Sequence, residues 1–523
     1  MTDAPDPPDP ERPEDPELSV AAQLNVILAD AGAEDAFAEL DRKAGKPPED
    51  QAGGDGAGDG KKSQATRLVE LARRKYRTVL GTDGKTYAVP LDGPNTAMPL
   101  RGENGLRTRL AIAYYEDTEA AAGSSALADA LTALEGQAVD TTPEPVALRV
   151  ARHEGNLILD LGTPDGRAVV ISPGEWHLEP ESPVLFRRTT LISPLPAPSR
   201  ESGGLERLRA LLNVSDSGFR LLIAWLIAGL FPDIPHPILA ITGEQGTAKS
   251  TCGRLLVTLI DQSPAPLRAA PKDGDSWMVQ ASAGWTVMLD NVSTIAPWFS
   301  DTLCKAVTGD GMVKRALYTD DDVSVISFRR VIGMTAIDAG ALRGDLAERL
   351  LPVELDPISP QNRRTDDELN AAFEPARPAV LGALLDLTAK VLKLLPTVKV
   401  ERLPRLADFA KILAALDQAT GWNTLADFTE LADEITATVI EADPFADAVR
   451  TLIRTRGEWT GTAAALLELL AAPDPAPKSW PRSARAVSGH LRRVAPALRK
   501  SEIDVDFSRD KTSRAIRLAV RPD

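Results

Sequence analysis

The sequence predicts a mixed α/β protein with several domains. Three features predict this class. A short apolar strand over residues 238–242 runs directly into a glycine-containing loop and then into a helix. Alternating apolar runs between residues 146 and 180 are typical of half-buried strands. Residues 459–523 have the pattern of two helices followed by two strands. At roughly 100–200 residues per domain, a chain of 523 residues provides for three to four domains.

The charge excludes a protein that coats a polyanion with its whole surface. Lys and Arg total 59, Asp and Glu total 75, and the net charge is −16. The charge is unevenly spread, since residues 1–60 hold 16 acids and 4 bases, whereas residues 480–523 hold 11 bases and 5 acids. A basic C-terminal region is therefore hidden by the acidic total.

Cysteine content and hydropathy favour a cytoplasmic protein with no membrane association. Cys252 and Cys304 do not suggest a disulfide framework and fit a reducing compartment. The first residues lack a basic stretch followed by an apolar one, so no signal peptide is expected. The longest apolar run, residues 221–231, is about half of the roughly 20 residues needed to cross a bilayer. We expect it to be a buried helix.

Residues 1–62 are expected to be a disordered acidic tail that contains one tethered helix, residues 19–43, and a Gly- and Pro-rich linker. This helix is either dispensable or a docking element for a protein partner. Residues 63–200 are expected to form a β-rich α+β module. Its predicted elements are helices over 65–79 and 125–137, a hairpin turning at Asp83-Gly84, and short strands between 146 and 180.

Residues 201–365 are expected to be a P-loop NTPase core with a helical lead-in. The strand at 238–242 continues as GEQGTAKST, and strand, glycine loop, Lys-Ser/Thr and helix is the context that a phosphate-binding loop requires. The glycines allow successive backbone N–H groups to point inward, and the helix N-terminus adds positive potential. Lys249 is expected to reach the β- and γ-phosphates of ATP, and Ser250 to coordinate Mg²⁺. The expected nucleotide-binding residues are Gly243, Glu244, Gln245, Gly246, Thr247, Ala248, Lys249, Ser250 and Thr251.

Ala248 stands where glycine usually precedes the lysine. We expect the alanine to be accommodated with a negative φ.

Asp290 is the expected Walker B acid. It follows the buried-strand run 285–289, about 40 residues after Lys249, and would hold Mg²⁺. Many ATPases place Glu after this acid, but here the position is Asn291, which orients water yet accepts its proton poorly. Slow or partner-stimulated hydrolysis is the resulting hypothesis. The alternative for Asp290 is an ordinary turn after a buried strand.

A third strand, residues 331–334, ends at Thr335, which is placed to sense the γ-phosphate or is a satisfied hydroxyl in a turn. Arg349 precedes another apolar strand. In a ring ATPase such an arginine can act in the neighbouring subunit's site. Alternatively it pairs with Glu348 or Asp345, and Arg343 is the second candidate for the same role.

A hairpin is predicted over residues 312–330, with an acidic turn at its tip and bases on its arms. The arms carry Lys314, Arg315, Arg329 and Arg330 as candidate nucleic-acid contacts. The alternative is a surface hairpin with solvated charges.

Together these motifs resemble the AAA+-type ATPases of phage and mobile elements, which are similar to superfamily 3 helicases and to the ATPase part of poxvirus-type primase–helicases. The resemblance covers roughly residues 140–440. It implies a homo-oligomeric ring, ATP with Mg²⁺, and nucleic acid as the track. DNA is favoured over RNA, although the sequence does not decide between them. The resemblance also implies catalytic roles for Lys249, Asp290, Asn291, Thr335 and Arg349. This chain departs from the pattern at Asn291, at Thr335 where superfamily 3 has Asn, and at the acidic hairpin tip.

A primase active site is not apparent. Such a site needs paired carboxylates that hold two metals. Upstream of residue 200 the sequence offers Asp160 alone on its strand and the isolated His153 and His177.

Residues 366–458 are expected to be a helical connector and residues 459–523 a basic winged-helix-like domain, with Thr460 as N-cap of its first helix. Its candidate nucleic-acid contacts are Arg482, Arg485, Arg492 and Arg493 on the second helix and Arg509, Lys511 and Arg514 on the wing. A protein-docking winged helix is the alternative.

The leading functional prediction is a motor-type ATPase that remodels or unwinds DNA for a mobile element. The second is a nucleotide-gated assembly module that hydrolyses slowly, which Asn291 favours. A small-molecule kinase fits less well, because a pore-like hairpin and a basic winged tail are unusual in kinases.

Overall fold

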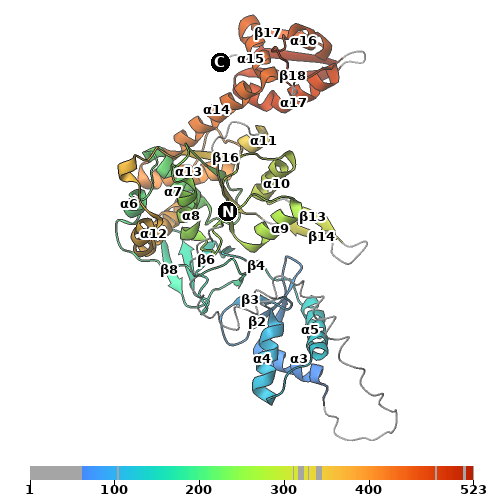
Figure 1. Ribbon diagram of the computed structural model, residues 1–523, viewed down its shortest axis with the longest axis vertical. Coiled ribbons are helices and arrows are strands. Elements are labelled where there is room, and N and C mark those ends of the chain that lie inside the picture. The colour runs from blue at the N-terminus through green and yellow to red at the C-terminus, as the bar shows by residue number, and fades with distance from the viewer. Residues whose placement is uncertain are drawn as a thin grey trace, which may run out of the picture. The chain divides into compact units, whose positions relative to one another are not determined.

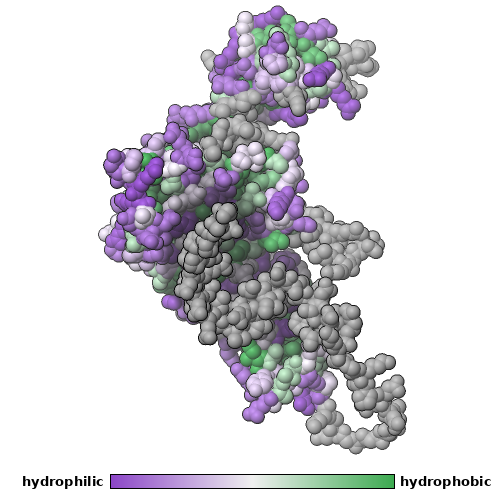
Figure 2. Space-filling model, in the orientation of Figure 1, coloured by the Kyte–Doolittle hydropathy of each residue, from purple (hydrophilic) through white to green (hydrophobic). Residues whose placement is uncertain are grey.

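The computed structural model describes residues 62–102, 105–309, 311–315, 323–327, 329–336, 344–477, 480–509 and 514–521 (Figure 1). The predicted tail with its helix at 19–43, the hairpin tip and Arg343 lie outside these residues. Within them, no helix is both long enough and apolar enough to span a membrane. On the face drawn in Figure 2, hydrophilic residues predominate and hydrophobic ones are scattered between them.

The first folded part packs three helices and a five-stranded sheet. The helices are α3 (Gln64–Lys75), α4 (Leu106–Thr118) and α5 (Ser124–Val139). The sheet has the order β1-β2-β3-β9-β4, made of β1 (Tyr76–Leu80), β2 (Thr86–Pro90), β3 (Thr96–Pro99), β9 (Leu185–Arg187) and β4 (Val146–Ala147). The hairpin predicted at Asp83-Gly84 is confirmed, with Leu80 paired to Thr86. Helix α4 was not predicted, because exposed Ile112 and Tyr115 obscure its apolar periodicity.

A second, antiparallel sheet has the order β5-β6-β7-β8, made of β5 (Val150–His153), β6 (Asn156–Asp160), β7 (Ala168–Ser172) and β8 (Glu175–Glu179). These strands match the predicted alternating runs. One face of this sheet, including Leu157, Val169 and Trp176, belongs to the same hydrophobic core as the central sheet described next. Fully buried Arg149 pairs with Asp261 at 2.9 Å, and Asp261 also accepts a hydrogen bond from the backbone of Thr286. The boundary predicted at residue 200 therefore does not coincide with a break in the core.

The central sheet is parallel and carries the predicted motifs. Its order is β11-β12-β15-β10-β16, made of β11 (Leu267–Arg268), β12 (Thr286–Leu289), β15 (Val331–Thr335), β10 (Ile238–Thr242) and β16 (Leu350–Glu354). Its helices and lead-in are α6 (Gly204–Arg209), α7 (Asp216–Ala228), α8 (Lys249–Ile260), α9 (Gly274–Ala283), α10 (Pro297–Thr308) and α11 (Gly344–Ala347). Helix α7 is buried from Gly218 onward except at Arg220, as the apolar run that starts at Leu221 predicts. Because β15 lies between β10 and β12, the ends of these three strands meet at one edge.

The predicted hairpin is present as β13 (Gly311–Arg315) paired antiparallel with β14 (Val323–Ser327). The side chains of Lys314 and Arg315 lie outside the described part of the chain. Arg329 and Arg330 follow the hairpin instead of lying on its arm.

The stretch predicted as a connector, residues 366–458, contains helices in its first part. After the short 3-10 turn η1 (Pro360–Asn362) come α12 (Asp366–Leu394), α13 (Ala407–Thr420) and α14 (Thr424–Ala442). Helix α12 starts with a complete capping box, formed by Thr365 and Glu368.

The C-terminal part has its own hydrophobic core, which includes Phe445, Val449 and Leu491. Its elements are α15 (Pro444–Arg456), β17 (Glu458–Gly461), α16 (Ala463–Leu469), α17 (Ala484–Lys500), β18 (Ile503–Arg509) and β19 (Arg514–Val520), with strand order β17-β19-β18. The predicted helix–helix–hairpin order is present. The core includes α15, which lies before the boundary predicted at residue 459. The predicted cap at Thr460 was wrong, because Thr460 lies in β17 and Thr462 caps α16 by accepting from Ala465 N.

Candidate nucleotide site and nucleic-acid surface

The loop between β10 and α8 has the backbone of a tight, glycine-dependent turn. Gly243 has φ +135° and Gly246 has φ +85°, both in the region that favours glycine. A Cβ on Gly243 would lie 2.9 Å from the carbonyl oxygen of Leu355, so space as well as conformation requires glycine there. Thr247 is buried, and its hydroxyl donates to Glu244 O at 3.0 Å. The strand–loop–helix context predicted for residues 238–260 is thus present.

Ala248 has φ +59° and ψ +35°, so the expected negative φ was wrong. This position, at the N-cap of α8, needs the left-handed conformation that glycine supplies more easily. For an L-residue that conformation costs roughly 1–2 kcal/mol. The loop therefore keeps its shape despite the substitution, at some expense in stability.

Lys249, the first residue of α8, directs its ammonium back across the loop. Its Nζ donates to the carbonyl oxygens of Gly243 and Glu244, each at 2.7 Å. The cation is therefore held by the loop itself, beside the first turn of a helix whose backbone N–H groups favour anions.

Three side chains from different elements meet behind this loop. The hydroxyl of Ser250 donates to Asp290 Oδ1 at 2.8 Å, and the hydroxyl of Thr335 donates to the same oxygen at 2.6 Å. Asp290 follows β12 and Thr335 ends β15, so the strand order brings together residues that are far apart in the sequence. Within the described residues, Asp290 Oδ2 makes no hydrogen bond. A hydroxyl and a carboxylate oxygen are donors that suit Mg²⁺.

The turn after Asp290 is fixed by Thr335. The Thr335 hydroxyl accepts from Asn291 N at 2.8 Å, and its carbonyl accepts from Val292 N at 2.8 Å. Asn291 has φ +54°, a conformation that Asn tolerates much better than Glu does. The amide at this position, where an acid is usual, thus suits the backbone. The Thr335 hydroxyl is already engaged as donor and acceptor.

Arg349 lies at the opposite edge of the sheet from Lys249. Its carbonyl accepts from Ile238 N, at the start of β10, whereas the glycine loop follows the end of that strand. Its exposed fraction is 8%. It is therefore placed away from the loop of its own chain and is largely covered.

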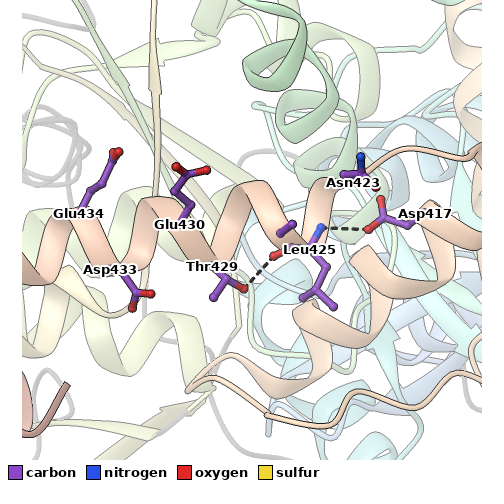
Figure 3. Close-up of a pocket in the computed structure, with 8 residues that line it drawn as sticks. Asp417, Asn423, Leu425, Thr429, Glu430, Asp433 and Glu434 are labelled. Atoms are coloured by element: carbon purple, nitrogen blue, oxygen red, sulfur yellow. Dashed lines mark hydrogen bonds between the residues drawn. The ribbon is translucent and has the colours of Figure 1, made fainter. Parts of the chain in front are cut away.

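A cavity of about 830 Å³ opens beside the loop. It is lined by Gly246, Ala248 and Thr251 of the loop and α8, by residues 210–213 between α6 and α7, and by residues that follow β16. A second cavity, of about 790 Å³, lies between α13 and α14 (Figure 3). Its lining includes Asp417, Glu430, Asp433 and Glu434, and Figure 3 shows Glu430 and Glu434 projecting from the same side of α14. An acidic lining repels phosphates, so of these two cavities the first suits a nucleotide better.

Arg329 and Arg330, predicted as nucleic-acid contacts, are tied into the core. Arg329 donates to the carbonyl oxygens of Pro232 and Thr308 at 3.2 and 3.0 Å. Arg330 is 8% exposed, and its guanidinium donates to the carbonyl oxygens of Ala281 and Arg329. Burial lowers the pKa of Arg330 to about 9. The burial of Arg330 contradicts its predicted contact with nucleic acid. The hydrogen bonds of Arg329 to two backbone carbonyl groups indicate a structural role for that side chain.

Helix α17 differs, because its predicted arginines are exposed. Arg485, Arg492 and Arg493 lie on its outer side together with the small residues Ala486 and Gly489. The opposite side packs into the domain, where His490 Nε2 bonds to Asp443 Oδ2 at 2.6 Å. Arg482 is also exposed, just before the helix. The side chains of the predicted wing residues Arg509 and Arg514, and Lys511 entirely, lie outside the described residues.

The described chain is therefore a mixed α/β protein in which a glycine loop, a lysine and a hydroxyl–carboxylate pair meet at one edge of a parallel sheet. Residues 205–437 match the family model of the replication protein RepA of actinomycete integrative conjugative elements, and residues 445–523 match the model of the RepA C-terminal domain. Over these two stretches the chain is similar to a replication protein of a mobile element, in agreement with the predicted mobile-element context. No curated protein matches the chain.

Several solved structures share weak similarity. The C-terminal region of NrS-1 is 12% identical, with a TM-score of 0.36 over 88% of this chain and 100% of that chain. Cch, an active helicase of SCCmec type IV, is 12% identical, with a TM-score of 0.40 over 85% of this chain and 93% of that chain. The JCV helicase is 12% identical, with a TM-score of 0.23 over 46% of this chain and 74% of that chain. Similarities this weak carry no conclusion about the function of this chain.

Asn213, residues 357–359 and residues 361–364 were missed by the sequence analysis, although they line the cavity beside the loop. They belong to no motif, and only the folded chain brings them to the loop.

Proposed function

We propose that this protein binds and hydrolyses ATP with Mg²⁺ and uses the energy to act on DNA during replication of a mobile element. The observation that carries the proposal is the cluster of Ser250, Asp290 and Thr335 behind the glycine loop that holds Lys249. A P-loop ATPase needs this combination of hydroxyl, carboxylate and cation at one strand edge.

In this proposal Lys249 moves from the loop carbonyls to the β- and γ-phosphates, and Ser250 and Asp290 hold Mg²⁺. Among the described residues no group of three His, Cys, Asp or Glu side chains is placed to hold a metal. A magnesium ion here would therefore depend on phosphate and water oxygens for its remaining ligands, which is its usual mode of binding. The metal would neutralise charge that develops on the phosphates.

Thr335 has a positioning role in this mechanism. Its hydroxyl holds the carboxylate of Asp290 and the backbone of Asn291, so it fixes the metal ligand and the turn that faces the attacking water. Asn291 orients that water but does not accept its proton well, which favours slow or DNA-stimulated turnover.

DNA contact is assigned to the exposed arginine face of α17, and the RepA match over residues 445–523 supports a role of this part in replication. Assembly into a homo-oligomeric ring, with Arg349 serving the neighbouring subunit, belongs to the same proposal. Because Arg349 is 8% exposed in the single chain, that role requires its side chain to move on assembly.

The test is ATP turnover of the full chain without nucleic acid, with single-stranded DNA, with forked DNA and with RNA of the same sequence. We expect turnover to rise several-fold with DNA and to be lost in Lys249→Ala. Turnover that stays flat with every nucleic acid would reject DNA as the track. ATP binding by Lys249→Ala at parental affinity would reject the nucleotide site.

A nucleotide-gated assembly module is the second candidate, and Asn291 in place of an acid favours it. Oligomers that form with ATP, persist without hydrolysis and do not unwind a fork would select it.

A further inference from the structure

Residues 357–364, here called the strap, connect β16 to α12 and lie beside the glycine loop. Both ends of the strap are anchored. At its start, Asn213 Nδ2 donates to Asp356 O at 2.6 Å and to Thr247 O of the loop at 3.0 Å. At its end, Arg254 of α8 donates to Asn370 Oδ1 at 2.7 Å, in the first turns of α12. The strap is thus tied to both sides of the loop–helix unit.

The strap and the loop enclose the 830 Å³ cavity between them. Leu211, Leu212, Pro357 and Ile358 give one part of this cavity an apolar lining. Asn213, Ser359, Gln361 and Asn362 add amide and hydroxyl groups. Apolar side chains beside amide and hydroxyl groups are the composition that suits a nucleobase and its sugar.

The cavity also receives positive charge from the strap. Nη2 of Arg363 lies 3.9 Å from the position that a Cβ on Gly246 would take, so its guanidinium reaches the loop. The N-terminus of α12 is less suited to supply such charge, because its first turn is acidic and the N–H groups of Thr365 and Glu368 are used by the capping box. The adjacent Arg364 also lines a separate cavity against α6, with Arg207 and Pro375.

We propose that the strap and residues 211–213 form the nucleoside half of the ATP site, and that Arg363 contacts the phosphates of the same nucleotide. This inference rests on the proposed function, since it divides one ATP between the glycine loop and the strap. Arg363 is exposed, and within the part of the chain that the structure describes its guanidinium has no hydrogen-bond or ion-pair partner. Its donors can therefore meet phosphate oxygens in the bidentate geometry that arginine favours.

The test uses the full chain, a fluorescent ATP analogue, and inorganic tripolyphosphate as competitor. Arg363→Ala is expected to weaken both ATP and tripolyphosphate about tenfold, the loss expected for a charge-assisted contact. Ile358→Ser is expected to weaken ATP and to leave tripolyphosphate unchanged, because only the nucleoside meets the apolar lining. Arg109→Ala, at an exposed arginine of α4 that does not line this cavity, is the charge-matched control and is expected to change neither. Thermal unfolding without nucleotide checks that each variant folds.

Unchanged affinity in Arg363→Ala, or an equal loss in Arg109→Ala, would overturn the assignment of Arg363. An equal loss of ATP and tripolyphosphate in Ile358→Ser would overturn the nucleoside pocket. Lys249→Ala separates this result from the proposed function. If Lys249→Ala loses ATP while the strap variants keep it, the glycine loop stands and the strap is rejected. A parent protein that binds no ATP rejects both.

Discussion

The nucleotide site and helix α17 are built in different ways. The site behind β10 depends on backbone conformations at Gly243, Gly246 and Ala248 and on three hydrogen-bonded side chains. The outer face of α17 depends on exposed cations, two of which, Arg485 and Arg493, have no fixed partner among the described residues. The nucleotide site therefore depends on the positions of individual atoms, whereas the outer face of α17 depends on its total positive charge.

This difference teaches which sequence signals can be trusted at the level of single residues. The sequence of a phosphate-binding loop predicts the conformation of its backbone, because the spacing of the glycines and the lysine determines the turn. An arginine in a basic stretch contains no such information. Arg330 and Arg492 look alike in the sequence, yet one is buried against backbone carbonyls and the other lies exposed over the ring of Phe507 at 4.8 Å.

The largest effect on ATP turnover is expected in the nucleotide site, where a single substitution should abolish most of the activity. Asp290→Asn keeps the shape but removes the charge that would hold the metal, so ATP turnover should fall by about 100-fold or more. Phosphate release at saturating ATP and Mg²⁺ measures this. Asp433→Asn, an exposed acid on α14, is the matched control and should leave turnover unchanged. Turnover above a tenth of the parent value would contradict the role of Asp290.

On α17 the effects should be graded instead. Alanine at Arg485, Arg492 or Arg493 should each lower the slope of log affinity against log salt by about one, since each removes one phosphate contact. Binding to a DNA duplex across a salt series measures the slope. Arg450→Ala is the control, because Arg450 is paired with Asp447 and Glu441 in the same domain. Slopes that do not change in any of the three variants would assign the face to a protein partner.

Arg330→Ala tests whether the buried arginine supports the fold and does not bind DNA. A loss of DNA binding like that of the α17 variants would contradict the comparison. We expect unchanged DNA binding and a free energy of unfolding lower by about 2–3 kcal/mol, because buried carbonyl groups lose their donor. Chemical denaturation followed by the buried Trp225 and Trp285 measures the stability of the core. If Arg330→Ala lowers the slope of log DNA affinity against log salt and leaves the stability unchanged, Arg330 contacts DNA after all.

The smallest effect concerns the anchor that orients α17. Burial of Asp443 opposes its charge, but hydrogen bonds from His490 and from the backbone of Ala446 and Phe445 keep the pKa of Asp443 below its usual range. Asp443→Asn keeps a residue that can cap α15 but removes the charge from the bond with His490, so it should cost about 1 kcal/mol at neutral pH. Since a lowered folded-state pKa stabilises the protein only while the group is ionised, this difference should disappear as pH falls below about 3.8. Unfolding of both proteins between pH 3 and pH 7 tests it, and a difference that grows at low pH would contradict it.

Much of the fold could be predicted because local patterns determine it. The glycine loop, the strand before Asp290, the Asp83-Gly84 hairpin and the two strands at the C-terminus follow from periodicity and turn residues. The backbone at Ala248 could not be predicted, because its positive φ belongs to its position at the N-cap of α8, where the loop enters the helix, and not to alanine itself. The strap was invisible for a similar reason, since exposed polar residues between two elements acquire meaning only from what folds beside them.

The hydrophobic core that joins β5–β8 to the central sheet has a practical consequence for dissecting this protein. The family match begins at residue 205, which invites a fragment starting there. Such a fragment would leave Asp261 buried without Arg149, and would expose to water the surface that Leu159 and Val169 cover in the whole chain. We expect it to aggregate on expression, whereas a fragment that begins ahead of Val146 retains these partners.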